Sequence, residues 1–400
     1  TTVPFFGCAP EVKPPPPPVK ETTLNIAFTG PYSGPWAAVA VQFKGGADDF
    51  VRYANESNYI PGVKFELFTG DTGYNPAKSL SLYERFKGKG LIWFATVTTT
   101  DAEPIRKFLE EDEILGICTS VSPQMVSPPG WWFDMGAPLY PDAFTGFCQW
   151  VIEEDWDYEA KGRAPRVANM GFDNPKGRGP SMAKEWIEEN LKGKIEFPLD
   201  IIIPFNIADA TAELTRVKEA KIDYLFFSGG IPECMVVLKN MAELGLRDKI
   251  TFMADISIGG FFSIFRKIPL WRGTYQEALY AYIMADKPGT NLARECQKKY
   301  HPETFYEDSF YFMGFLPTWI GIEAVKRAVD EVGLEKLTSA DVKRALESGQ
   351  PFETGGILNP VVYGPDKRVN NYVCIYKTGP DGEPILVKEP FPLPPTQGIK

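Results

Sequence analysis

Short apolar runs alternate with stretches of helical spacing along most of the chain. In the first of these units, an apolar run at residues 24–28 ends in a Gly/Pro loop, and helical spacing resumes at Trp36. This order predicts a buried strand, a loop and an amphipathic helix, which together form the first βα unit of a parallel sheet. Open parallel sheets bind ligands at the carboxyl ends of their strands, where backbone N–H groups at the helix start are unpaired. The loop at residues 30–36 is therefore a candidate ligand wall.

The same unit repeats in two series, which are separated by a stretch of Ser, Pro and aromatic residues at 120–141. Such a stretch is typical of a crossing between lobes. The predicted strands, with helices between them, are residues 24–28, 63–68, 91–94, 114–118, 167–170, 201–203, 224–227 and 250–253. Late helices are predicted near 291–299, 309–332 and 339–347, and strand-like pieces at 361–363 and 371–377. Two alternating series predict an α/β protein with two doubly wound, Rossmann-like lobes of parallel sheet.

Composition limits the classes of molecule that the chain can bind as partners. The formal net charge of −10 argues against nucleic acid or an anionic membrane surface, because both need clustered Lys and Arg. No apolar stretch approaches the roughly 20 residues that a membrane helix requires. A chain of 400 residues, 44% of them hydrophobic, exceeds the size at which a single core keeps growing. Length therefore also favours two lobes.

The first 21 residues differ in composition from the rest. Cys8 follows apolar residues and Gly7, and it precedes the proline run at 14–18, which favours a stiff polyproline II spacer. A Cys in this setting resembles the cleavage and acylation site of bacterial lipoproteins. We expect a lipid on Cys8 to be the only membrane contact, at the periplasmic or extracellular face of the cell membrane. The alternative is an unstructured end with a chance Cys.

Catalytic signatures are sparse. The chain has one histidine, His301, which argues against Ser-His-Asp and Cys-His chemistry. The nucleotide-binding patterns G-x-x-x-x-G-K-[ST] and G-x-G-x-x-G after a strand are missing. Ser181 and Lys184 match the S-x-x-K of penicillin-recognising serine enzymes, and residues 377–379 match K-T-G, but the intervening S-x-N is missing. The cysteines after Cys8 lack metal-ligand spacing, so we expect buried free thiols, no metal, no cofactor and no catalysis.

Several segments resemble the leucine/isoleucine/valine-binding protein family. They are NIAFTGPYSGP at 25–35, GGA at 45–47, GDT at 70–72, NPA at 75–77, EP at 103–104, Gly177, Gly179, DYLFFSGG at 223–230 and FM at 252–253. Their order and spacing agree with the family over residues 24–388. This family comprises type I periplasmic binding proteins, which deliver ligands to ABC importers.

The resemblance implies two lobes joined by three crossings, with a small ligand enclosed between them by hinge closure. In this arrangement, residues 22–140 and 278–355 form the first lobe, and residues 141–277 and 356–388 form the second. Residues 1–21 are a lipoprotein-like end with a Pro-rich linker, and residues 389–400 are a tail. ABC permease subunits are the implied partners.

The resemblance also implies ligand-binding residues in the first lobe. The family's hydroxyl pair for the ligand carboxylate falls on Thr98 and Thr99 and on the loop with Ser120 and Ser122. Hydroxyls and free amides at a helix start suit an anion on physical grounds as well. The alternative is that this segment only caps a helix.

In the second lobe, two positions depart from the family pattern. A family aromatic aligns with Lys176, and the acidic residue that meets a ligand ammonium aligns with Ile256, one past Asp255. If Asp255 does not turn inward, the ammonium of an amino acid lacks its partner, and burying it unpaired costs several kcal/mol. Lys176 favours a carboxylate or other anion, unless it is solvated in its Gly-rich loop. Gly230 belongs to the same predicted wall.

Aromatic side chains border both predicted walls: Tyr32 and Trp36 in the first lobe and Phe172 in the second. Flat side chains in a cleft suit an aromatic or long apolar ligand, although core packing is the alternative for each. The predicted ligand is a branched-chain or other hydrophobic amino acid, with an aromatic or aliphatic carboxylate as the alternative. A ligand-sensing or structural lipoprotein without transport is a further alternative.

Overall fold

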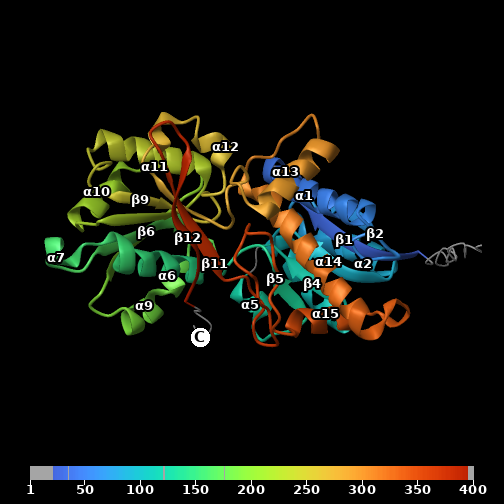
Figure 1. The fold of residues 1–400 in the computed structure, drawn as a ribbon. Helices are drawn as coiled ribbons and strands as arrows, with labels where there is room; N and C mark the ends of the chain where they lie inside the picture. The colour runs from blue at the N-terminus through green and yellow to red at the C-terminus, as the bar shows by residue number, and fades with distance from the viewer. Residues whose placement is uncertain (1–20, 35, 120–121, 175, 395–400) are drawn as a thin grey trace, which may run out of the picture.

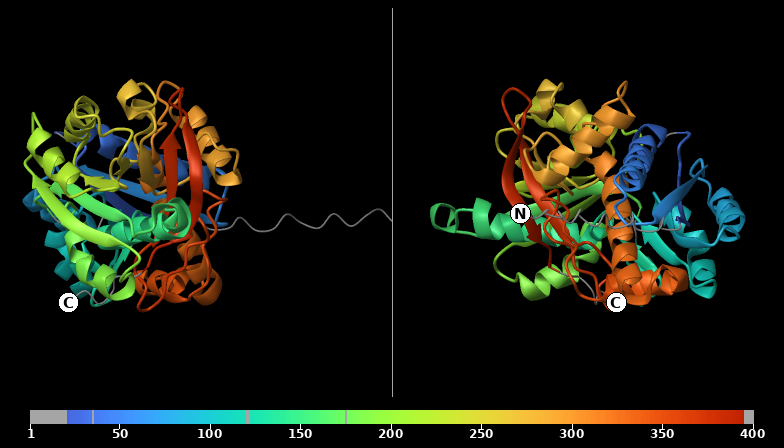
Figure 2. Two further views of the ribbon diagram at one scale, coloured as in Figure 1. Left: turned by 90° about the vertical axis from the view of Figure 1, so that its left-hand side faces the viewer. Right: turned by 45° about the vertical axis from the view of Figure 1, so that its right-hand side comes forward.

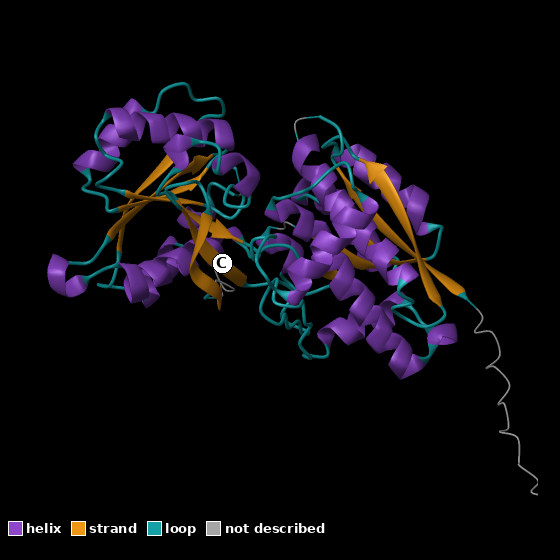
Figure 3. Cartoon of the chain, turned by 45° about the horizontal axis from the view of Figure 1, so that its top comes forward, coloured by secondary structure: helices purple, strands orange, loops and turns teal. Residues whose placement is uncertain are grey.

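A computed structural model places the chain in two lobes that lie side by side (Figure 1). The structure describes residues 21–34, 36–119, 122–174 and 176–394, and it contains two separate sheets. In each lobe the strands are enclosed between helices (Figure 3). This arrangement confirms the predicted α/β class with two doubly wound lobes.

The first lobe contains a parallel sheet. Its strands, in spatial order, are β2 (Val63–Asp71), β1 (Thr22–Gly30), β3 (Leu91–Thr96), β4 (Leu115–Cys118) and β5 (Trp132–Asp134). β3 is buried along its whole length, as expected of a strand that is covered by helices on both faces. β1 and β3 are neighbours, so the loops after these two strands leave the same edge of the sheet.

Helices from both halves of the chain cover this sheet. They are α1 (Ala37–Glu56), α2 (Pro76–Lys87), α3 (Thr99–Ala102), α4 (Arg106–Glu111), α5 (Pro123–Val126), α13 (Pro288–Tyr300), α14 (Phe312–Val332) and α15 (Ser339–Glu347), with 3₁₀ turns at η1 (Glu103–Ile105), η4 (Ser309–Tyr311) and η5 (Leu334–Lys336). α1 and α14 cross closely, because a Cβ on Gly314 would lie 1.8 Å from Phe43 O. This glycine lets the two backbones touch, and Phe50 then stacks on Trp319 at 5.3 Å.

The second lobe contains a mixed sheet. Its strands, in spatial order, are β12 (Pro384–Pro392), β11 (Tyr372–Thr378), β10 (Tyr275–Ala278), β9 (Thr251–Ala254), β8 (Tyr224–Ser228), β6 (Arg166–Phe172) and β7 (Glu196–Ile203). The pairs from β10 to β7 are parallel, whereas β11 pairs antiparallel with both β10 and β12. Figure 2 shows the long red β11–β12 hairpin at one side of this lobe.

Alternate residues of the central strands enter cores on opposite faces of this sheet. Leu225 and Phe227 belong to one buried cluster, and Tyr224 and Phe226 belong to another. The covering helices are α6 (Tyr140–Trp150), α7 (Tyr158–Lys161), α8 (Gly179–Met182), α9 (Lys184–Asn190), α10 (Thr211–Glu219), α11 (Ile231–Glu243) and α12 (Phe262–Phe265), with a π segment at η2 (Val151–Asp155) and a 3₁₀ turn at η3 (Pro269–Trp271).

The chain crosses between the lobes three times: from β5 to α6, from β10 to α13 and from α15 to β11. Backbone hydrogen bonds tie two of these crossings together. Asp134 N donates to Arg368 O at 2.7 Å, and Asn370 N donates to Asp134 O at 3.1 Å. A few residues in these crossings therefore connect two otherwise separate sheets.

Two segments near the C-terminus differ from the expected division. Ile357, Val361 and Tyr363 pack in the core of the first lobe, although the sequence placed residues 356–388 in the second. β12 extends through Pro392, so residues 389–392 are part of the sheet and not of a tail. In both segments, the cause is contact with distant parts of the chain, which a local pattern does not record.

Three strands were missed by the sequence pattern, and one of them is β12, which the pattern left without a predicted strand. β5 has three residues, which is too short to register as an apolar run. β10 has the sequence YQEA, and its buried Gln276 and Glu277 hide it from a search for apolar positions. The predicted strand at 361–363 is reduced to an isolated bridge between Phe352 and Val361.

Candidate functional site

Lys176 lies in the loop after β6, and its ammonium reaches the ends of two neighbouring strands. Its Nζ donates to Gly229 O at 2.5 Å and to Ser257 Oγ at 2.7 Å, and it lies 3.8 Å from Asp255 Oδ2. Gly229 follows β8 and Asp255 follows β9, and the strands β6, β8 and β9 are adjacent and parallel. The side chain of Lys176 is only 16% exposed, so the alternative of a solvated lysine is wrong.

Asp255 turns into the second lobe. Its side chain is 3% exposed, and Oδ1 accepts hydrogen bonds from Ser257 N at 3.1 Å and from Ser257 Oγ at 2.6 Å. The Ser257 hydroxyl thus accepts from Lys176 and donates to Asp255. Burial raises the pKa of Asp255, and the Lys176 ammonium and the Ser257 hydrogen bonds offset only part of that rise.

A second carboxyl group, on Glu277 of β10, interacts electrostatically with Asp255. Glu277 is fully buried, and neither of its carboxyl oxygens has a hydrogen-bond partner among the described residues. Burial first, and then the charge of Asp255, raise the pKa of Glu277 well above its usual value. This shift favours the neutral acid at Glu277.

The loop that carries Lys176 is held against the end of β6. Asn169 Nδ2 donates to Gly177 O at 3.0 Å, and Gly177 N donates to Asn174 Oδ1 at 2.8 Å. A Cβ on Gly177 would lie 2.1 Å from Phe172 O, so only glycine allows this close approach of the two backbone segments. The tight loop fixes the direction in which the Lys176 side chain leaves the backbone.

Aromatic rings flank this cluster. Phe172 stacks on Phe205 with ring centroids 4.1 Å apart, and the ammonium of Lys176 lies 5.9 Å from the Phe172 ring centre. Phe205 is 62% exposed, which is unusual for a phenylalanine and suits a ring that covers a ligand. A Cβ on Gly230 would lie 3.4 Å from Phe172 Cζ, so Gly230 adjoins the same ring. The sequence pattern missed Phe205 and Ser257, although each follows a strand end.

In the first lobe, the loop after β1 is ordered by its own contacts. Tyr32 OH donates to Phe28 O at 3.0 Å, and Ser33 N donates to Asp71 Oδ1 at 3.1 Å. The Trp36 ring stacks on Tyr74, with centroids 6.2 Å apart, and these side chains are 45% and 42% exposed. An exposed aromatic pair therefore lies beside the carboxyl ends of β1 and β2. Tyr32 itself is partly buried and packs against the core.

The predicted hydroxyl residues have different local roles. Thr98 is the N-cap of α3: its Oγ1 accepts from Asp101 N at 3.2 Å and donates to Asp101 Oδ2 at 2.7 Å. Thr99 is the first residue of this helix. The Ser122 Oγ is buried and has no hydrogen-bond partner among the described residues. Ser120 lies outside the described residues, as does Cys8.

The two lobes meet beside these strand ends. The loop after β9 contacts the first lobe, because Ser309 N donates to Gly260 O at 3.0 Å and Phe261 lies 4.4 Å from Phe310. Phe310 in turn stacks on Phe43 of α1, with centroids 6.1 Å apart. The carboxyl end of β9 in the second lobe is thus directed towards α1, the helix that follows the β1 loop in the first lobe.

The remaining sequence motifs have structural roles. Ser181 hydrogen-bonds to Asp200 on β7, whereas Lys377 on β11 lies 3.2 Å from Tyr275 OH on β10. Four strands separate β7 from β11, so the S-x-x-K and K-T-G segments do not meet. The five cysteines within the described part of the chain are buried free thiols, as predicted.

The described part of the chain lacks the usual signatures of a metal site and of a membrane-spanning helix. No group of three or more His, Cys, Asp or Glu side chains there is arranged to hold a metal ion. Over the same residues, no helix combines the length and apolar character needed to span a bilayer.

Comparison with known proteins supplies the family. The model for the family described as periplasmic binding protein matches residues 23–383. The chain belongs to this family. The resemblance inferred from the sequence segments is thereby confirmed, and the match covers both lobes and all three crossings.

Two similar proteins match this chain over most of their own length. A Leu/Ile/Val-binding protein homolog 3 of Brucella melitensis is 23% identical over 335 residues, which cover 83% of this chain and 85% of the relative. A branched-chain amino acid ABC transporter protein from Thermus thermophilus with bound valine has a TM-score of 0.78 and 21% identity, covering 93% of this chain and 97% of that one.

A third protein broadens the range of ligands seen on this fold. A solute-binding protein of an ABC transporter from Rhodopseudomonas palustris, solved with 3,4-dihydroxybenzoic acid, has a TM-score of 0.72 and 17% identity, covering 94% of this chain and 99% of that one. At these identities, the solved structures establish the type I periplasmic binding fold of the chain.

Proposed function

We propose that this periplasmic binding protein serves an ABC importer and captures a small carboxylate between its two lobes. One observation carries the proposal: groups suited to bind a small polar molecule gather at the carboxyl ends of the strands in both lobes. Ser122 in the first lobe offers a buried hydroxyl without a partner among the described residues, and Lys176 and Phe205 lie at the strand ends of the second. Relatives named for Leu/Ile/Val binding and for a dihydroxybenzoic acid complex support a carboxylate as ligand.

In the proposed mechanism, the first lobe receives the ligand carboxylate. Thr99 at the start of α3 and the buried hydroxyl of Ser122 supply donors. The apolar part of the ligand lies against the exposed Trp36 and Tyr74 rings. The second lobe then closes over the ligand. Contacts to the ligand that exist only in the closed form shift the population of the protein towards that form.

The cellular setting follows from the same proposal. The chain acts outside the cytoplasm, on the periplasmic or extracellular face of the membrane, and passes its ligand to ABC permease subunits. A lipid on Cys8 retains it there. Metabolic labelling with palmitate tests this anchor: label incorporated by the native chain and lost in Cys8→Ala supports it, and equal label in both contradicts it.

Isothermal titration with small carboxylates tests ligand capture. We expect at least one ligand from a panel of branched-chain and aromatic amino acids and the corresponding acids without the amino group to bind. At 100 times its dissociation constant, this ligand should stabilise the fold by about 2.7 kcal/mol. Thr99→Ala and Ser122→Ala should weaken binding about tenfold with little loss of stability, since each removes one hydroxyl donor.

Thr215→Ala is the matched control, because Thr215 is exposed on α10 and its hydroxyl donates only to Thr211 O at 2.7 Å. A panel without any binder, or unchanged affinity in both site variants, would contradict the proposed site. Uptake of the labelled ligand by cells that lack the chain then separates transport from sensing: undiminished uptake would remove the importer role.

A further inference from the structure

The ammonium of Lys176 uses the acceptors that converge at the end of β6, β8 and β9. An ammonium has three N–H donors. Two of them reach Gly229 O and Ser257 Oγ, at 2.5 and 2.7 Å, and the charge is balanced by Asp255 at 3.8 Å. A carbonyl, a hydroxyl and a carboxylate are the partners that a bound ammonium requires. Here the protein supplies both the acceptors and the cation.

We infer that the ligand of this protein carries a carboxylate but no ammonium group. The ammonium of Lys176 already occupies the position at the carboxyl ends of β6, β8 and β9, the second-lobe wall of the site, where a ligand cation would bind. The inference rests on the proposed function and narrows its ligand class. Branched aliphatic or aromatic monocarboxylates fit this class, and zwitterionic amino acids do not. A ligand ammonium at this wall meets a like charge and finds Gly229 O and Ser257 Oγ already engaged by Lys176. Asp255 Oδ2 has no hydrogen bond among the described residues, but it lies 3.8 Å from Lys176 Nζ, whose charge it balances.

The other acidic groups of this wall do not offer a second cation position. Glu277 is fully buried behind Asp255, and its raised pKa favours the neutral acid. Glu233 lies in the first turn of α11, where the helix dipole favours a negative charge. Its Oε1 accepts from Asn206 N at 2.7 Å. Glu233 is 4% exposed and holds the loop that carries Phe205.

The surroundings of Lys176 suit the uncharged body of such a ligand. Phe172 stacks on the exposed Phe205 next to the lysine, and Trp36 stacks on the exposed Tyr74 in the first lobe. Both pairs offer flat apolar surface near a strand end. A hydrophobic acid can therefore place its carboxylate against the hydroxyl donors of the first lobe. Its apolar part then lies between the aromatic pairs of the two lobes.

Matched ligand pairs test the inference on the full chain. Calorimetry compares L-phenylalanine with 3-phenylpropanoate and L-leucine with 4-methylpentanoate, so that each pair differs by the amino group alone. We expect the native chain to bind the acid without the amino group at least about tenfold more tightly in one or both pairs, because a like charge and unmet hydrogen bonds oppose the ammonium.

Lys176→Ala then removes the built-in cation and frees its acceptors. The ratio of the two affinities should shift by at least about tenfold towards the amino acid, since Asp255 becomes available to the ligand ammonium. Lys176→Arg keeps the charge and should keep the preference of the native chain. Circular dichroism melting of each variant checks that the fold is intact.

The outcomes separate the inference from the function on which it rests. An amino acid that binds the native chain as tightly as its partner acid, or a ratio unchanged in a folded Lys176→Ala, would overturn the inference and leave ligand capture standing. If Glu233→Gln then abolished amino acid binding, Glu233 would be the ammonium partner. If neither these acids nor any carboxylate of the wider panel bound, both the inference and the proposed capture would fall.

Discussion

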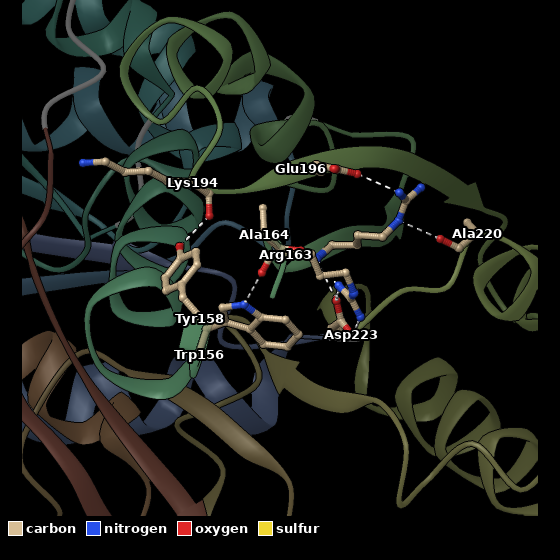
Figure 4. Close-up of polar contacts among 9 residues, drawn as sticks. Trp156, Tyr158, Arg163, Ala164, Lys194, Glu196, Ala220 and Asp223 are labelled. Atoms are coloured by element: carbon tan, nitrogen blue, oxygen red, sulfur yellow. Dashed lines mark hydrogen bonds and ion pairs between the residues drawn. The ribbon is translucent and has the colours of Figure 1, made fainter. Parts of the chain in front are cut away.

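The two ends of the second-lobe sheet carry ion pairs of similar chemistry in opposite surroundings. At the amino end, Arg163 donates two hydrogen bonds to Asp223, at 2.7 and 2.8 Å (Figure 4). These side chains are 47% and 18% exposed. At the carboxyl end, Lys176 faces Asp255, and these side chains are 16% and 3% exposed. The arginine of the first pair reaches into solvent, whereas both members of the second pair are withdrawn from it.

The contacts at the amino end of the sheet connect neighbouring segments of the second lobe. Trp156 Nε1 donates to Arg163 O at 2.8 Å, and both residues are labelled in Figure 4. Arg166 donates to Ala220 O at 2.9 Å and to Glu196 at 2.7 Å. Asp223 also accepts from Arg166 N at 2.9 Å. This network joins the starts of β6, β7 and β8, and the side chains of Arg163 and Glu196 in it are 47% and 53% exposed.

The difference teaches what each end does. An exposed ion pair contributes little to stability and is screened by salt. The contacts at the amino end therefore only hold neighbouring segments of the chain together at the surface. A buried pair costs desolvation that its attraction barely repays, so a fold gains little stability from having one. The buried pair at the carboxyl end is therefore better explained by a binding role, for which a fixed charge has a use.

Removal of the buried carboxylate should have the largest effect. Asp255→Ala leaves the Lys176 ammonium without its counter-charge, and we expect a loss of about 3 kcal/mol in the free energy of unfolding. Urea titration measures the loss. In the double variant Asp255→Ala/Lys176→Met, most of the loss should be recovered, because no unpaired charge remains. A double variant as unstable as the single one would show that the pair is not the cause.

The loop that aims Lys176 should be nearly as sensitive. Gly177→Ala forces a Cβ to within 2.1 Å of Phe172 O, and the backbone has to shift to relieve the clash. We expect a loss of about 2 kcal/mol in unfolding free energy, together with weaker ligand binding. Gly193→Ala is a comparison in the same lobe, where a Cβ meets nothing within 4 Å although φ is +76°. It should leave binding unchanged, and an equal loss of binding in both variants would contradict the role of Gly177.

A buried carboxylate without a lysine sharpens the contrast. Burial, offset in part by His301 and a hydrogen bond from Tyr311 OH at 2.9 Å, raises the pKa of Asp49 to about 6. The folded-state pKa lies above the unfolded value of 3.8, so the favourable contribution is complete below pH 3.8 and is lost as the pH rises through 6.

Asp49→Asn removes this titration. The difference in unfolding free energy between the variant and the native chain should therefore move in favour of the variant by about 2 kcal/mol between pH 4 and pH 7. Urea titrations at a series of pH values measure it. A difference that stays constant with pH would show that Asp49 does not titrate in this range.

The exposed pair should give the smallest effect. Arg163→Ala breaks the bidentate contact with Asp223, and we expect a loss of less than about 1 kcal/mol, which 1 M salt reduces further. Ligand affinity should not change, because the network lies at the opposite end of the strands. A loss as large as that of Asp255→Ala would end the distinction between the two ends.

Local pattern predicted the fold well, whereas the predicted ligand-binding residues stay predictions. The runs at residues 24–28, 91–94 and 224–227 became central strands, because a short apolar run flanked by helical spacing is typical of a buried strand in a parallel sheet. β10 was hidden by its buried Gln276 and Glu277, whose burial depends on contacts that the segment does not contain. Thr98 was predicted to meet the ligand carboxylate, and its capping bond to Asp101 depends on local geometry that the sequence left open.

By itself, the sequence determined the two alternating series, the family, and the strand ends at which Lys176 and Asp255 stand. Only the tertiary structure decided that these two side chains face one another, with Ser257 between them and Phe205 beside them. Periodicity along the chain predicts most buried positions, because burial depends mainly on the face of its own helix or strand on which a residue lies. Which charge meets which depends on how β6, β8 and β9 are ordered in the sheet, and that order is a property of the whole fold.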